Sequence, residues 1–460
     1  MNEKARKGSG AGGIKRRACG VAALLLTVMA SGAGIVFDGA QRTVRIVDYP
    51  EAYPCTPSLL YAAAQSHGWT CVTYQAGSDT YTVDATVCIG DNDGSETCFQ
   101  LGQTSQPHET MVVKGDVIVS PYYVEGRNPG RWYTAKHALN RLQIGLTDRP
   151  DVRPALKIAS APENPRTLSV GAKGFGGQLH VYHGTITAAT SDWAHAIAGA
   201  GPNQLVVMKG DSIILRDAHL SWMTGVMTYG AQAFKPVATL TVRFECENTV
   251  FENGGTALTD AGPGTVIRNC VFRKLQTAIG DYGNLNLVLI QCVFKDNQRN
   301  WELTHSAQGL LCIDCRMGAP STGNVYKAWL NPKTGQWNYP GVIEQKHIRV
   351  CARDEQDRPV TNAVVNVLNE QGQAGQVQHG RQPVDAQGRT PGWENKAGPI
   401  ILTQSARKAV DQSGKPSETF YSYKICVKAD GFEDAVIAGY KPTAIGAEVR
   451  VPMRRKTRKD

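Results

Sequence analysis

A staggered repeat in the middle of the chain constrains its fold more than any other feature. Four segments recur after 21, 22 and 23 residues: ENTVFENGGTA (247–257), RNCVFRKLQTA (268–278), IQCVFKDNQRN (290–300) and IDCRMGAP (313–320). Aligned, they give a polar column of Asn248, Asn269, Gln291 and Asp314, a small column of Thr249, Cys270, Cys292 and Cys315, and an apolar column of Phe251, Phe272, Phe294 and Met317. A period of this length is typical of a solenoid, in which each repeat buries its apolar side by stacking on its neighbours.

The polar column predicts where each repeat turns. Asn tolerates the left-handed region and bonds its own backbone, so we expect this column at a corner. The small column is then predicted to face inward, because free cysteine is among the most buried residue types. The pattern resembles that of right-handed parallel β-helix proteins of the pectate-lyase-like superfamily. The resemblance implies an all-β solenoid over 166–323, in which His183 and Asp217 extend the polar column backwards at longer spacing.

The segments on either side of the repeat are predicted to cover its ends. Residues 38–165 are expected to form an N-terminal cap and early irregular coils. Within them, Thr56 precedes Pro57 and the run SLLYAAAQSH, which predicts a helix with an N-cap and a stop at Gly68. Residues 324–345 break the period and are rich in Trp, Tyr, Pro and Gly. We expect them to form a linker or a capping strap.

The last hundred residues carry a different pattern. Alternating apolar runs occupy 348–373 and 423–437, separated by turn-prone stretches. They resemble the carboxypeptidase-regulatory-like family of small β-sandwich domains at Val350, Asp354, Pro359, Val360, Asn362, Ala363 and the Gly431-Phe432 turn. The resemblance implies an Ig-like accessory or spacer module over 346–453 without catalytic residues of its own. A basic tail, 454–460, follows it.

The N-terminus has the organisation of a secretory signal peptide over 1–33. Three basic residues at 15–17 precede the apolar run CGVAALLLTVMA (19–30), which small residues follow. That run is too short for a stable membrane span, so we expect an extracytoplasmic location. The formal net charge of +9 falls to +4 without this segment. Since no clustered basic face on a recognisable module is apparent, we expect no nucleic-acid partner.

Export permits disulfides, and removal of Cys19 leaves eleven of the twelve cysteines. We predict bridges between Cys55 and Cys71, between Cys88 and Cys98, and between Cys351 and Cys426. The cysteines of the repeat are predicted to act as buried small residues. The spacing Cys312-x-x-Cys315 leaves a metal site as the alternative interpretation of that pair.

Five residues of the repeat are candidates for catalysis. A glycoside hydrolase needs two carboxylates about 5–10 Å apart; Asp260 and Asp281 each follow a column Phe by nine residues and are expected to stack on adjacent coils. A lyase acting on uronic acids needs a base and cations that neutralise the carboxylate. His305 would fall near the aspartates, with Lys274 and Arg299 supplying positive charge. Turn-forming aspartates and solvated charges are the alternative interpretation.

Two functions stay open from the sequence. The first is an exported polysaccharide lyase or glycoside hydrolase, with calcium left open as a cofactor. The second is a non-catalytic cell-surface protein that binds glycan or protein. Of the possible partners, we expect a polysaccharide or cell-surface glycan.

Overall fold

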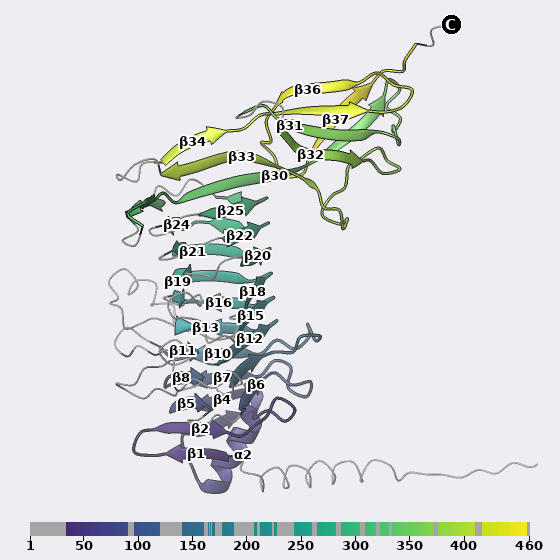
Figure 1. Cartoon of the computed structure of the whole chain (residues 1–460). Helices are drawn as coiled ribbons and strands as arrows, with labels where there is room; N and C mark the ends of the chain where they lie inside the picture. The colour runs from purple at the N-terminus through teal and green to yellow at the C-terminus, as the bar shows by residue number, and fades with distance from the viewer. Residues whose placement is uncertain are drawn as a thin grey trace, which may run out of the picture.

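The computed structural model describes residues 34–90, 96–119, 140–160, 164, 166, 168–170, 177–187, 207–208, 212–222, 225–227, 243–259, 265–281, 287–303, 309–318, 323–330, 334–371, 376–409 and 416–457. Over these residues the chain is all-β with large parallel sheets, as predicted, and its single α-helix is α2 (Pro57–His67). The strands form an elongated column that ends in a separate group of strands near the C-terminus (Figure 1). No helix in these ranges is long and apolar enough to cross a membrane. The predicted signal peptide lies outside them.

Three large sheets make up the column and its end. The six-stranded sheet contains β1 (Gly34–Asp38), β2 (Thr43–Val47), β5 (Thr86–Ile89), β8 (Val117–Val119), β11 (Leu168–Val170) and β14 (Val207–Met208). The 13-stranded sheet contains β3 (Val72–Gln75), β4 (Thr80–Val83), β7 (Thr110–Val113), β10 (Ala155–Ile158), β13 (Thr185–Thr187), β16 (His219–Ser221), β17 (Gly225–Met227), β19 (Val250–Thr259), β21 (Val271–Asp281), β23 (Val293–Lys295), β24 (Arg299–Leu303), β26 (Arg316–Met317) and β27 (Val325–Tyr326).

The 12-stranded sheet contains β6 (Cys98–Leu101), β9 (Arg141–Ile144), β12 (Gln178–Tyr182), β15 (Ser212–Arg216), β18 (Arg243–Glu247), β20 (Val266–Arg268), β22 (Leu287–Ile290), β25 (Leu310–Ile313), β30 (Gly341–Asp354), β33 (Ile400–Ala409), β34 (Pro416–Phe420) and β37 (Ala447–Met453). Of two smaller sheets, one pairs β28 (Trp329–Leu330) with β29 (Trp337–Asn338). The other contains, in spatial order, β32 (Gln376–Pro383), β31 (Val364–Asn369), β35 (Tyr423–Lys428) and β36 (Ala435–Tyr440).

The chain visits the large sheets in turn, and each visit adds one strand beside the previous one. Strand β19 pairs in parallel with β21, which pairs in parallel with β23, so that Phe251, Phe272 and Phe294 stand in register. In the 12-stranded sheet, β18, β20, β22 and β25 follow one another in the same way. We call one such pass of the chain a rung.

The polar column forms the predicted corner of each rung. Its members all have left-handed backbone, with φ between 50° and 55° at His183, Asp217, Asn248, Asn269, Gln291 and Asp314. A second corner follows five residues later, where Trp222, Asn253, Lys274 and Asp296 have φ of 61°, 53°, 53° and 55°. The sequence did not reveal this second corner, because Trp and Lys are not turn-prone residues.

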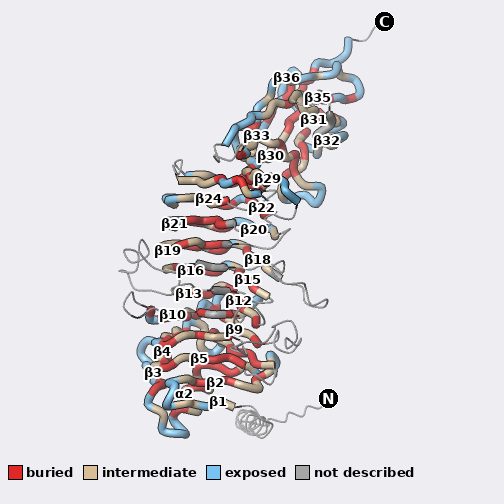
Figure 2. Tube along the Cα trace, turned by 60° about the vertical axis from the view of Figure 1, so that its left-hand side comes forward, coloured by how far each residue is buried: buried red, intermediate tan, exposed pale blue. Residues whose placement is uncertain are grey.

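The apolar column forms the centre of the interior. The rings of Phe251 and Phe272 stack with centroids 5.2 Å apart, and those of Phe272 and Phe294 with centroids 5.1 Å apart. Figure 2 shows buried residues continuing from rung to rung along the column. At the N-terminal end α2 packs Leu60 and Ala64 into the same core. The predicted helix caps are confirmed: Thr56 Oγ1 accepts a hydrogen bond from the Leu59 amide, and Gly68 has left-handed backbone.

A second hydrophobic cluster lies beyond the column. The members of this second cluster lie between Ile348 and Met453 in the sequence. Those of the first cluster, inside the column, lie between Val44 and Val342, together with Ala409. The 14-residue strand β30 connects the two, because Val342 pairs with Leu310 of β25 and Ile348 pairs with Ala447 of β37. The column and the C-terminal strands therefore share one continuous backbone element.

The predicted disulfides are wrong for this structure: all eleven cysteines from Cys55 to Cys426 are free. Cys88 on β5 and Cys98 on β6 belong to different sheets, as do Cys351 on β30 and Cys426 on β35. Cys55 instead lies beside the strand of Cys98, whose carbonyl oxygen accepts a hydrogen bond of 2.9 Å from the Cys55 amide. Spacing along the chain predicted these bridges, but the sheet to which each strand belongs decides which thiols meet.

Glu109, just before β7, is a fully buried carboxyl group whose Oε1 accepts a hydrogen bond from the Gly102 amide. Burial raises the pKa of Glu109 from 4.5 to about 7, with the Asp79 charge adding to the effect and the Gly102 bond opposing it. Between these two pH values the unfolded chain loses its proton first, so stability falls as pH rises. We expect a loss of about 3 kcal/mol from this group between pH 4 and 8.

Urea unfolding of the wild type and Glu109→Gln across this range measures the effect. The amide keeps the acceptor for Gly102 but cannot ionise, so the stability difference between the two proteins should change by that amount. Glu355→Gln, at an exposed position, is the control. Parallel pH profiles for wild type and Glu109→Gln would contradict the assignment.

Candidate functional site

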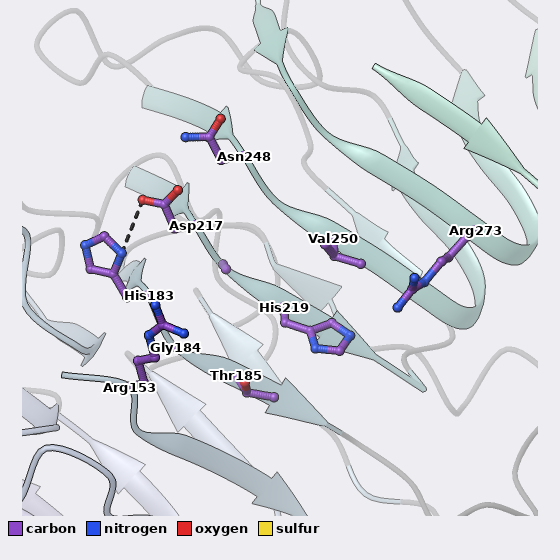
Figure 3. A pocket seen from close by; sticks show the side chains of 10 residues that line it. Arg153, His183, Gly184, Thr185, Asp217, His219, Asn248, Val250 and Arg273 are labelled. Carbon is purple, nitrogen blue, oxygen red and sulfur yellow. Dashed lines mark ion pairs between the residues drawn. The ribbon is translucent and has the colours of Figure 1, made fainter. Parts of the chain in front are cut away.

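A groove of about 350 Å³ lies on the outer face of the 13-stranded sheet (Figure 3). It crosses the beginnings of β10, β13, β16, β19 and β21. Its lining residues are Arg153, His183, Gly184, Thr185, Asp217, Ala218, His219, Asn248, Val250 and Arg273. Five strands at about 4.8 Å spacing span about 19 Å, so the groove fits an extended ligand better than a compact one.

Strand alternation places the lining side chains outward. Leu220 and Phe251 are buried, so His219 and Val250, one residue earlier in β16 and β19, face away from the core. Parallel pairing sets Thr185, His219 and Val250 side by side on successive rungs. The groove is therefore built from equivalent positions of the repeat.

Two corner residues form an ion pair at one side of the groove. The distance from His183 Nδ1 to Asp217 Oδ2 is 3.2 Å, and the two side chains face each other from adjacent rungs (Figure 3). The other ring nitrogen, Nε2, lies 3.5 Å from the Thr147 carbonyl oxygen, to which it can only donate. In the tautomer that carries its proton on Nδ1, Asp217 accepts from the ring and Nε2 is the basic atom.

A second charged group lies beside the groove on β16, β19 and β21. Glu252, whose side chain is 16% exposed, lies between two basic partners. Its Oε1 is 3.6 Å from His219 Nε2, and its Oε2 contacts Arg273 Nε. Glu252 and Arg273 are direct register partners, so the sheet itself sets this contact.

The groove lining carries more positive than negative charge. Arg153 and Arg273 lie on rungs near its two ends, whereas Asp217 is its acidic lining residue. Arginine matches planar carboxylates and other oxyanions through paired N–H donors. These side chains favour an anionic ligand.

Three of the five predicted catalytic residues lie within the described ranges, and for one of them, Asp281, the backbone alone is described. Lys274 is exposed at the second corner, and Arg299 begins β24, where it forms a 2.8 Å ion pair with Glu302. Asp281 is the last residue of β21, and its backbone pairs in register with Leu303. Asp260 and His305 lie outside the described residues. The predicted cluster therefore stays a prediction.

The register shows which positions of neighbouring rungs correspond. Lys295 pairs with Arg273, and Lys274 matches Asp296 at the second corner. A signal for the groove was present in the sequence, because Glu252, Arg273 and Lys295 each directly follow a column Phe. Reading that position as a further column would have found the charged face.

Within the described ranges, no group of three or more His, Cys, Asp or Glu side chains could hold a metal ion. Neither calcium, which the sequence left open as a cofactor, nor a metal at Cys312-x-x-Cys315 gains support from these residues. No protein-family model matches the chain, and no curated protein matches it. The geometry of the groove therefore carries the argument about function.

Proposed function

We propose that this chain is an exported right-handed parallel β-helix protein that binds an anionic polysaccharide in the groove across β10–β21. The interleaved parallel sheets and the stacked corner columns support the β-helix. The antiparallel sheet of β31, β32, β35 and β36, with its own hydrophobic cluster, supports an Ig-like sandwich over 346–453. In this proposal the sandwich is a spacer that extends the column.

The observation that carries the proposal is the pair of arginines on one elongated groove. Arg153 and Arg273 lie on rungs about 19 Å apart by strand spacing. An extended acidic glycan presents negative groups at intervals along such a length, whereas a single small anion would contact only one arginine. Screening by salt should weaken this binding, since the groove is open to solvent.

Among the catalytic forms of this function, the groove supports a lyase best. A lyase needs a base that removes the proton next to a uronate carboxylate, and a cation on that carboxylate. His183, oriented by Asp217, would be the base, and Arg153 or Arg273 the cation. A hydrolase needs two carboxyl groups that face the ligand. Asp217 contacts His183, and Glu252 contacts His219 and Arg273, so both carboxylates are already engaged by basic side chains.

A turnover screen of the mature chain tests the proposal against uronate-containing and neutral polysaccharides, with and without calcium. Absorbance from new double bonds would support the lyase, and reducing ends alone would replace it with a hydrolase. Retention on an acidic glycan without product would support the non-catalytic alternative. Neither retention nor turnover across the panel would overturn the proposed function.

Arg273→Gln should weaken binding of an acidic polysaccharide by about ten- to a hundred-fold, because it removes a charge-assisted contact. Glu252 keeps its His219 neighbour in this variant. Arg268→Gln is the matched control, since Arg268 is exposed on β20 of the other sheet. The binding constants would be measured by calorimetry at low salt. Equal losses in both variants would count against the groove and in favour of diffuse surface charge.

A further inference from the structure

A row of buried thiols runs along one corner of the column. Thr249, Cys270, Cys292 and Cys315 stack at the position after the left-handed residue, and each is at most 2% exposed. Each side chain donates to the carbonyl oxygen two residues before it, with donor–acceptor distances of 2.9, 3.2, 3.6 and 3.6 Å. In these four rungs the corner holds small side chains that carry a donor, whereas Gly184 and Ala218 occupy the same position in the two earlier rungs.

Three members of this row also reach back to the preceding rung. Thr249 donates to the Leu215 carbonyl oxygen at 3.2 Å, Cys292 to Ile267 at 3.8 Å and Cys315 to Leu289 at 3.4 Å. The equivalent position for Cys270 is Cys246, because Leu215, Cys246, Ile267 and Leu289 follow one another in register in the 12-stranded sheet. Here the side chains themselves meet, with the two Sγ atoms 3.5 Å apart.

The two thiols approach each other from different parts of the rung. Cys246 points inward from strand β18, whereas Cys270 points inward from the corner that follows β20. Stacked corner cysteines such as Cys270 and Cys292 have parallel side chains one strand spacing apart, about 4.8 Å. A disulfide needs Cβ atoms about 3.8 Å apart and converging side chains. Because their side chains converge, Cys246 and Cys270 are better placed to form a disulfide than Cys270 and Cys292.

We propose that Cys246 and Cys270 form a disulfide that joins two adjacent rungs when the chain folds in the presence of a low-molecular-weight disulfide such as oxidised glutathione. The Cys270 thiolate attacks one glutathione sulfur and releases one glutathione thiolate. The Cys246 thiolate then attacks the Cys270 sulfur, forms the Sγ–Sγ bond and releases the second glutathione. The two protons of the cysteine thiols pass to the two released glutathiones, so atoms and electrons balance.

The closed interior explains why the fully folded chain holds these residues as thiols. Burial, followed by the contact with Cys246, raises the pKa of the Cys270 thiol well above its ordinary value. Since the thiolate is the reactive form, a closed rung reacts slowly. The bond therefore forms while rungs are open, before the core closes.

Trypsin mapping after oxidation tests the proposal. The mature chain is held with reduced and oxidised glutathione in urea just below its unfolding transition, then quenched, alkylated and digested without reductant. Cleavage after Arg243, Arg268 and Arg273 separates Cys246 in peptide 244–268 from Cys270 in peptide 269–273. We expect these two peptides to be joined and to separate on reduction. Recovery of 269–273 in alkylated form, or joined to the Cys292 peptide 275–295, would overturn the proposal.

Thermal unfolding gives an independent readout. Oxidation should raise the Tm of the wild type by about 5 °C, because the bond restricts the unfolded chain. Cys246→Ser should lose this rise. Cys292→Ser is the matched control and should keep it, since Thr249 already shows that the corner accepts a hydroxyl. A rise retained in Cys246→Ser would assign the stabilisation to another pair and contradict the proposal.

Discussion

Phe272→Ala is expected to lower the free energy of unfolding of the column by about 3 to 5 kcal/mol. Phe272 is fully buried and is the central ring of the three-membered stack, so its removal leaves a cavity and exposes one face of Phe251 and one of Phe294. The strands above and below are fixed by backbone pairing on both sides. Because that pairing limits collapse of the cavity, we expect the upper part of the range.

Urea unfolding of wild type and variant measures this loss. Phe272→Leu keeps most of the volume and should cost less than half as much, which separates the cavity from local strain. Val266→Ala, on the outer side of β20, should change stability by less than about 0.5 kcal/mol. A loss near 1 kcal/mol for Phe272→Ala would mean that the rungs close around the missing ring, contrary to the rigid stack inferred from the register.

The central corner and core could be predicted from the sequence because each depends on one residue at a time. Asn248, Asn269 and Gln291 have left-handed backbone. The phenylalanine three positions after each of them points into the core, as the alternation of side chains along a strand requires. The second corner at Lys274 could not be predicted, since tertiary packing imposes left-handed backbone on a residue that does not favour it. The direction of every side chain after Lys274 depends on that corner.

The irregular part of the groove could not be predicted because it depends on register between rungs of unequal length. His183 and Asp217 are separated by 34 residues and Asp217 and Asn248 by 31, so the intervening chain conceals the repeat. Only the pairing of β13, β16 and β19 shows that Thr185, His219 and Val250 lie side by side. A candidate site chosen from the regular repeats alone therefore omitted the irregular rungs, where the groove begins.

The last corner of the polar column has a further role that its neighbours lack. Asp314 is buried, and its Oδ1 accepts a 2.8 Å hydrogen bond from the His347 amide. Its Oδ2 accepts bonds from His347 Nδ1 at 2.6 Å and from Trp393 Nε1 at 2.8 Å. Beside it, Lys346 Nζ donates to the Cys315 carbonyl oxygen at 3.1 Å. One carboxylate thus ties the end of the column to the C-terminal strands.

Asp314→Asn should cost about 3 to 5 kcal/mol at neutral pH, because it leaves the half-buried donors His347 Nδ1 and Trp393 Nε1 without an acceptor at a buried position. Asparagine tolerates the left-handed backbone of this corner, so the loss would report on the hydrogen bonds rather than on the turn. Burial acts to raise the pKa of Asp314, but the hydrogen bonds from His347 and Trp393 prevail and lower it. A lowered carboxyl pKa stabilises the fold above its ordinary value of 3.8, and this stabilisation is lost as pH falls through the folded-state pKa.

Two measurements follow from this. At pH 7 the variant should unfold in two steps, with the C-terminal strands separating from the column first, whereas the wild type retains the junction to higher urea. As pH falls below the folded-state pKa of Asp314, the stability difference between the two proteins should shrink, because the wild-type carboxyl then also becomes neutral. Asp296→Asn is the matched control, since Asp296 has the same left-handed backbone at an exposed corner. An equal effect of both variants would assign the loss to corner geometry, and the junction would then depend on β30 alone.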